Sequence, residues 1–184
     1  MSGEGKVVCE TGASGSAVKA TVLDPCSLPE FFEGTDNCVS SSPSPILMYL
    51  RLSNNHLLGK LLEWLGQLEN LTELVLSNNQ FQGPIPDSLG NLQNLTKLSL
   101  QGNQLNGTLP ERIRNLFKLS TLDVSVNHLT GSISEVHFSR LSKLKILVVF
   151  RFLHLNVSSH WVPPSQVGNL NMHSCILGPC LFHS

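Results

Sequence analysis

The feature that most constrains the fold is a period of 24 residues that runs through the middle of the chain. Asparagine recurs at this step in one column and glycine in a second. The asparagine column is Asn55, Asn79, Asn103 and Asn127, and the glycine column is Gly59, Gly83, Gly107 and Gly131. The units open at Leu47, Leu71, Leu95 and Leu119, and one extra residue in the fourth unit moves the next opening to Leu144. Repetition at a fixed period of about 20 to 50 residues predicts a stacked-repeat architecture.

The unit reads L-x-x-L-x-L-x-x-N-x-L-x-G-x-I-P, which is the pattern of a leucine-rich repeat. Its L-x-L core alternates with period two and predicts a short strand with leucines on one face. Stacked units would align these strands in a parallel sheet over a continuous leucine core. The convex side is expected to be 3₁₀, irregular or short helical, and to bury Leu65, Leu89, Ile113 and Phe138. The fold class is therefore an α/β solenoid, a horseshoe segment of about five to six repeats.

Three regions are expected along the chain. Residues 1–45 form a leader that is predicted to be largely disordered, and residues 46–143 hold four regular repeats of 24 or 25 residues. Residues 144–184 hold degenerate repeats and a truncated C-terminus, with a sixth strand at Val167, Leu170 and Met172 and Cys175 in the asparagine column. An asparagine side chain has donors and acceptors for backbone groups at a turn, so Asn55, Asn79, Asn103 and Asn127 are predicted to form a structural ladder.

The candidate binding residues lie between the leucines of each strand. Side chains of a strand alternate between its two faces, so these residues are expected on the concave face, where solenoids bind partners. They are Tyr49, Arg51, Glu73, Val75, Lys97, Ser99, Thr121 and Asp123. Tyrosine and arginine are frequent interface anchors, which makes Tyr49 and Arg51 the first choices. Strands about 4.8 Å apart give a narrow sheet, which favours a peptide or a loop as the ligand.

Composition excludes several other classes of function. The net charge of −1 and the pI near 6.6 argue against a nucleic-acid partner. No trusted motif pairs a serine or cysteine nucleophile with histidine, so we expect no catalytic residues, no enzyme activity and no small-molecule cofactor. The cluster His173, Cys175, Cys180 and His183 is interpreted as ordinary repeat sequence, and no metal site is expected.

Four N-x-[ST] sequons begin at Asn70, Asn94, Asn106 and Asn156. In a secreted chain they would be glycosylation acceptors. An alternative remains open, because N-L-T also follows from the wording of the repeat itself.

The Gly-x-Ile-Pro form of the repeat resembles the extracellular leucine-rich repeats of plants. The segments from Leu119 to Gly131, from Leu155 to Pro164 and from Gly34 to Cys38 resemble plant receptor-like proteins of defence and development. The resemblance implies a membrane glycoprotein whose ectodomain binds a protein or peptide and signals through a partner receptor kinase. It implies a plasma-membrane or extracellular location. The chain as written shows no signal peptide and no transmembrane helix, which predicts a cytoplasmic location if it is expressed in this form.

The leader differs from the repeats. The segment from Lys6 to Gly15 resembles the first strand and glycine turn of an NADP-dependent cinnamoyl-CoA or dihydroflavonol reductase. Gly12 and Gly15 match that turn, but Val18 stands where a third glycine is expected and the helix that follows is missing. Two alternatives to peptide binding therefore stay open, which are a truncated or fused gene product without independent function and a remnant of such a reductase.

Overall fold

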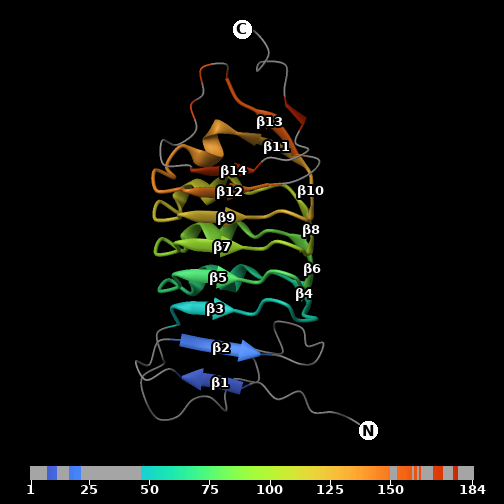
Figure 1. The fold of residues 1–184 in the computed structure, drawn as a ribbon, viewed down its shortest axis with the longest axis vertical. Helices are drawn as coiled ribbons and strands as arrows, with labels where there is room; N and C mark the ends of the chain where they lie inside the picture. The colour runs from blue at the N-terminus through green and yellow to red at the C-terminus, as the bar shows by residue number, and fades with distance from the viewer. Residues whose placement is uncertain are drawn as a thin grey trace.

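The computed structural model describes residues 8–11, 17–21, 47–149, 153–158, 160, 162, 168–171 and 176–177. Short strands stack one above another along the long axis of the molecule (Figure 1). The main sheet has eight strands in the order β1-β2-β3-β5-β7-β9-β12-β14. Their bounds are β1 Val8–Thr11, β2 Ala17–Thr21, β3 Tyr49–Arg51, β5 Glu73–Val75, β7 Lys97–Ser99, β9 Thr121–Asp123, β12 Ile146–Val148 and β14 Asn169–Asn171.

From β2 to β14 every pairing in this sheet is parallel, and the register joins equivalent residues of successive repeats, as in Leu74 opposite Leu98. The solenoid prediction is confirmed by this register. The pair β1 and β2 is antiparallel, whereas the βαβ unit of a dinucleotide-binding domain joins parallel strands. The described part of the leader thus differs from the arrangement that the reductase resemblance implies.

Two smaller sheets form the flank of the solenoid. The first has the order β10-β8-β6-β4, with β4 at Leu58–Lys60, β6 at Gln80–Pro84, β8 at Gln104–Gly107 and β10 at His128–Leu129. The second has the order β11-β13-β15, with β11 at Gly131–Ser134, β13 at Leu153–Asn156 and β15 at Ile176–Leu177. The fourth repeat therefore belongs to both sheets, because β10 pairs with the preceding repeat and β11 with the following one.

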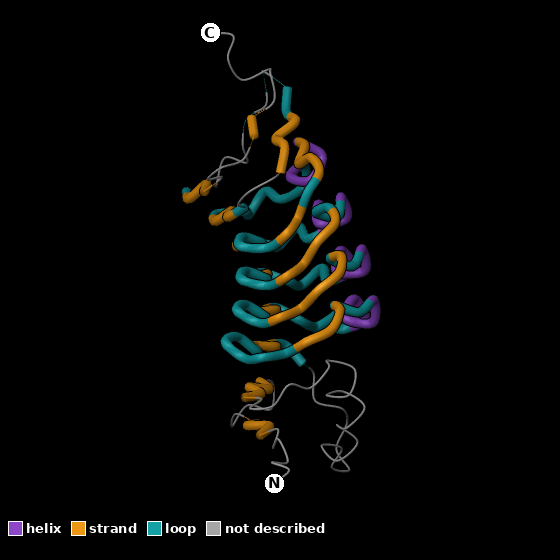
Figure 2. Tube along the Cα trace, turned by 90° about the vertical axis from the view of Figure 1, so that its right-hand side faces the viewer, coloured by secondary structure: helices purple, strands orange, loops and turns teal. Residues whose placement is uncertain are grey.

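The side opposite the main sheet carries short 3₁₀ helices (Figure 2). They are η2 Glu63–Gln67, η3 Asp87–Asn91, η4 Glu111–Asn115 and η5 Glu135–Phe138. The predicted convex residues Leu65, Leu89, Ile113 and Phe138 are buried in them. The expected convex side is confirmed, and we call it the convex side below.

The core lies between the strands and the 3₁₀ helices. Leucines from each repeat, such as Leu74, Leu98 and Leu122, are 0% exposed and form one continuous cluster. Fully burying one leucine side chain contributes about 1.5 to 3 kcal/mol, so repetition of this column provides most of the favourable free energy of folding.

The asparagine column ties each repeat to the one before it. Asn103 Nδ2 donates to the Leu100 carbonyl of its own repeat and to the Leu76 carbonyl of the preceding repeat, both at 3.0 Å. Its Oδ1 accepts from the Phe81 N–H at 3.1 Å. Asn79 and Asn127 make equivalent bonds, whereas Asn55 binds carbonyls of its own repeat. These side chains thus satisfy buried backbone groups where the strand ends.

Candidate functional site

The exposed surface of the main sheet, the concave face, carries a charged and aromatic cluster on β3 and β5. Arg51 donates to Glu73 Oε2 from Nε at 2.9 Å and from Nη2 at 2.6 Å. The Arg51 guanidinium carbon also lies 5.2 Å from the centre of the Tyr49 ring. The two side chains predicted as first choices therefore lie together. Both contacts hold the guanidinium in one orientation, although an exposed ion pair itself contributes only about 0 to 1 kcal/mol.

Lys97 extends this cluster onto the next strands. Its register partners are Glu73 on β5 and Thr121 on β9. The Lys97 side chain is exposed. Among the described residues the one ion pair is that of Arg51 with Glu73, so Lys97 has no carboxylate partner there. The face therefore presents one cation that is already paired and a second that is available to a ligand.

The remaining concave residues are less accessible than a simple alternation predicts. Val75, Thr121 and Asp123 are half-buried. Asp123 Oδ1 accepts from the Ser125 hydroxyl at 2.6 Å and from its N–H at 3.0 Å, so this carboxylate is occupied within its own strand end. Asp123 therefore holds the chain where the strand ends, in addition to facing solvent.

Ser99 differs from the expectation of an exposed side chain. It is 8% exposed, and its Oγ lies 3.0 Å from the Oγ of Ser77. A short side chain on a strand about 4.8 Å from its neighbours is covered by the longer side chains beside it. Ser99 is therefore largely inaccessible to a ligand, and its hydroxyl bonds Ser77 on the neighbouring repeat.

The four sequons are in different environments. Asn70, Asn106 and Asn156 are exposed, whereas Asn94 is half-buried. Asn94 Nδ2 donates to the Glu69 carbonyl at 3.0 Å, and its Oδ1 accepts from Lys118 Nζ at 2.8 Å. The Asn94 side-chain nitrogen, to which a glycan would be attached, is thus already hydrogen-bonded in the folded chain.

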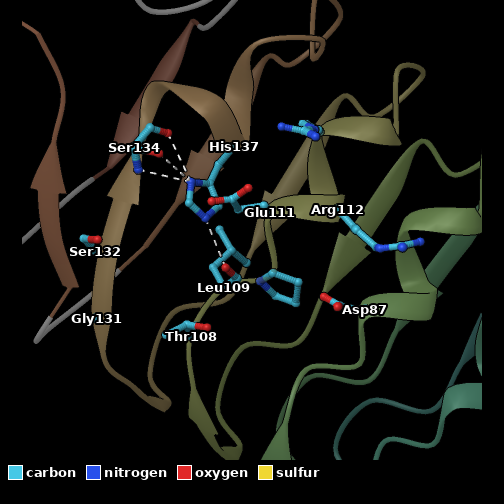
Figure 3. Close-up of a pocket in the computed structure, with 11 residues that line it drawn as sticks. Asp87, Thr108, Leu109, Glu111, Arg112, Gly131, Ser132, Ser134 and His137 are labelled. Carbon is cyan, nitrogen blue, oxygen red and sulfur yellow. Dashed lines mark hydrogen bonds between the residues drawn. The ribbon is translucent and has the colours of Figure 1, made fainter.

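A cleft of about 680 Å³, which the repeat pattern did not predict, lies on the convex side between the third and fourth repeats (Figure 3). His137 lies in its wall, 4% exposed. The Ser134 N–H donates to His137 Nδ1 at 3.1 Å, so the ring proton lies on Nε2, which donates to the Leu109 carbonyl at 3.1 Å. Ser134 stands where Pro86 and Pro110 stand in earlier repeats, next to the extra residue of this unit. A serine followed three residues later by a side-chain acceptor is a capping-box pattern. This pattern in the sequence could have indicated the contact between Ser134 and His137.

No group of three or more potential metal ligands occurs among the described residues. Within the same ranges, no helix has the length and apolar content that a membrane span requires. Some predicted features lie outside the described residues, namely Gly12, Gly15 and the cluster His173, Cys175, Cys180 and His183. The expected sixth strand overlaps β14 at Asn169–Asn171, whose side chains also lie outside the description.

Comparisons with known proteins agree with this geometry. Residues 45–105 match the family described as "Leucine rich repeat". No curated protein sequence matches the chain significantly.

Solved structures of plant receptor ectodomains resemble most of the chain. The plant peptide hormone receptor RGFR1, in complex with RGF2, is 32% identical with a TM-score of 0.64, over 71% of this chain and 21% of the receptor. The Arabidopsis receptor kinase HAESA, in complex with the peptide hormone IDA and the co-receptor SERK1, is 28% identical with a TM-score of 0.66, over 71% of this chain and 22% of HAESA. A chain of the BIR3–SERK2 complex from Arabidopsis thaliana is 28% identical with a TM-score of 0.56, over 76% of this chain and 77% of that one.

The chain spans about a fifth of the length of the two hormone receptors. The residues matched by the leucine-rich-repeat family, 45–105, include the concave strands β3, β5 and β7. From its register, its buried leucine columns and these likenesses, the chain has the leucine-rich-repeat fold of plant receptor ectodomains.

Proposed function

We propose that the chain is a non-enzymatic recognition module that binds a peptide or a protein segment on its concave face. The observation that carries the proposal is the cluster of Tyr49, Arg51 and Glu73 beside the unpaired Lys97. Arg51 is held in place before a ligand arrives, which reduces the entropy that binding must overcome. Receptors of similar fold were solved with peptide hormones, which supports a peptide as the ligand.

The charges indicate which ligand chemistry the face would select. Lys97 is available for a carboxylate, whereas Glu73 already neutralises Arg51. The Tyr49 ring supplies an aromatic surface next to this cation pair. We therefore propose a short extended ligand with an acidic group near Lys97 and an apolar group near Tyr49.

The proposal for the biological setting rests only on the similarity to solved plant receptor structures. We propose an extracellular role in signalling, with a receptor kinase as partner, in defence or in development. Exposed Asn70, Asn106 and Asn156 would then be glycosylated more readily than Asn94.

Panning a random dodecapeptide library against residues 1–184 tests the binding role, with fluorescence anisotropy to measure the affinity of an enriched peptide. We expect Lys97→Glu and the double variant Tyr49→Ala, Arg51→Ala each to raise its Kd by about tenfold or more, since hot-spot side chains carry about 2 kcal/mol each. Arg140→Glu, an exposed change on the convex side, is the matched control and should leave the Kd unchanged. An affinity that depends on Arg140 and ignores the concave variants would contradict the proposal.

A further inference from the structure

The flank of the solenoid contains an interruption that the proposed function does not use. In the ladder between β8 and β10, the Thr130 N–H donates to the Gly107 carbonyl at 2.8 Å. Parallel ladders repeat every two residues, so the next bond would run from the Ser132 N–H to the Leu109 carbonyl. The Leu109 carbonyl instead accepts from His137 Nε2. An imidazole thus takes the place of a strand backbone.

The ring of His137 connects the third and fourth repeats. It binds Leu109 of the third repeat through Nε2 and the Ser134 N–H of the fourth through Nδ1. One further change accompanies it. In earlier repeats Gly66 and Gly90 let neighbouring 3₁₀ helices approach closely, whereas Arg114 occupies the same column before η5.

One edge of β11 has no strand partner among the described residues. Within the described residues β11 is an edge strand that pairs with β13 alone. Alternate residues of a strand direct their backbone groups to the same edge, and Ser134 directs its N–H toward His137 and the cleft. Ser132 therefore presents its N–H and C=O to the cleft, as one donor and one acceptor for an added strand.

The walls of the cleft are charged. Arg112 and Glu111 on η4 and Asp87 on η3 line it (Figure 3), and none of them forms an ion pair among the described residues. The volume of about 680 Å³ falls in the range of about 300 to 1,000 Å³ that ligand sites have. An open strand edge beside unpaired charges of both signs fits a peptide backbone with charged side chains.

We infer that this cleft is a second binding site, separate from the concave face, for a short extended peptide that adds to β11 as a strand. Ser132 would bond the peptide backbone, and Arg112 would contact an acidic side chain of the peptide. Peptides bind open sheet edges in this way, with backbone bonds for affinity and side chains for specificity.

The test is a titration of ¹⁵N-labelled residues 1–184 with the peptide acetyl-Val-Asp-Val-Lys-Val-amide, followed by NMR. We expect the amide signals of β11 and η4 to shift, while those of β5 and β7 stay in place. A second peptide with the same side chains and every backbone nitrogen methylated should bind about tenfold more weakly, because it cannot donate to the strand edge.

Two variants separate specific binding from nonspecific charge effects. Arg112→Ala should weaken the first peptide severalfold, and Arg140→Ala should not change its affinity. The inference is overturned if the first peptide causes no shifts at millimolar concentration, if the methylated peptide binds equally well, or if the shifts fall on the concave face. The last result would assign the peptide to the concave face and leave that proposal standing.

Discussion

At the scale of single residues, the turn after each main strand requires a left-handed backbone. Asn54, Asn78 and Gly102 adopt φ values of 58°, 56° and 67° in this column, and Val126 adopts 52° in the fourth repeat. Asparagine and glycine tolerate this region, whereas a β-branched side chain there is an outlier. Val126 is also 58% exposed, so burial does not offset the strain.

Val126→Asn should therefore stabilise the protein. We expect the free energy of unfolding to rise by about 1 kcal/mol, because asparagine relieves the left-handed penalty of a branched residue. Urea denaturation followed by circular dichroism measures it. Val126→Thr is the control, since it removes the apolar exposure but keeps the branch, and it should gain little. Equal gains for both variants would mean that exposure, and not backbone strain, is the cause.

At the scale of elements, the stacking of the 3₁₀ helices depends on two glycines. A Cβ at Gly90 would lie 2.5 Å from the Arg112 carbonyl oxygen, and one at Gly66 would meet the carbonyl of Ser88. Neither contact can be relieved by a side-chain rotation, because the obstacle is backbone. The pairs η2–η3 and η3–η4 are therefore packed closely at these glycines, and Arg114 occupies the same column of the next unit.

Gly90→Ala should consequently lower stability although alanine favours helices. We expect a loss of about 1 to 3 kcal/mol, the usual effect of forcing a methyl group into packed structure. The matched control is Gly168→Ala, where a Cβ would meet nothing within 4 Å. Thermal melts of the two variants provide the comparison. A Gly90 variant as stable as the Gly168 variant would show that η3 and η4 separate without penalty.

At the scale of the whole molecule, the described strands of the main sheet pair with the strands of adjacent repeats. In the main sheet the chain order of the repeats is also their spatial order, from β3 through β5, β7, β9 and β12. Figure 1 shows this order of strands along the long axis of the molecule. Stability in such a stack is approximately a sum of repeat and nearest-neighbour contributions. Damage to one repeat should therefore act most strongly on the repeats beside it.

Leu98→Ala tests this coupling in the middle of the stack. Leu98 is 0% exposed, so the cavity should cost about 2 to 5 kcal/mol. Native-state hydrogen exchange should show the largest loss of protection in β5, β7 and β9, and a smaller loss in β12. Leu58→Ala, at a position 37% exposed, is the control with a small expected effect. A uniform loss over all these strands would indicate one cooperative unit in place of coupled neighbours.

Much of this architecture could be predicted because the repeat imposes it locally. The leucine columns predicted both the strands and the buried residues, and the amide chemistry of asparagine predicted a ladder that the structure shows at Asn79, Asn103 and Asn127. Period two also predicted which residues lie on the concave face. It did not predict the burial of Ser99, since accessibility depends on the length of side chains on adjacent strands.

The sequence by itself determined the solenoid, its strand register and the candidate face, because those properties follow from a period that every unit repeats. Only the tertiary structure decided the pairing of Arg51 with Glu73, which joins residues of two repeats, and the cleft beside His137. Both arise where one repeat differs from the next. A periodic pattern specifies what repeats share, whereas contacts between unlike side chains depend on which repeats become neighbours in space.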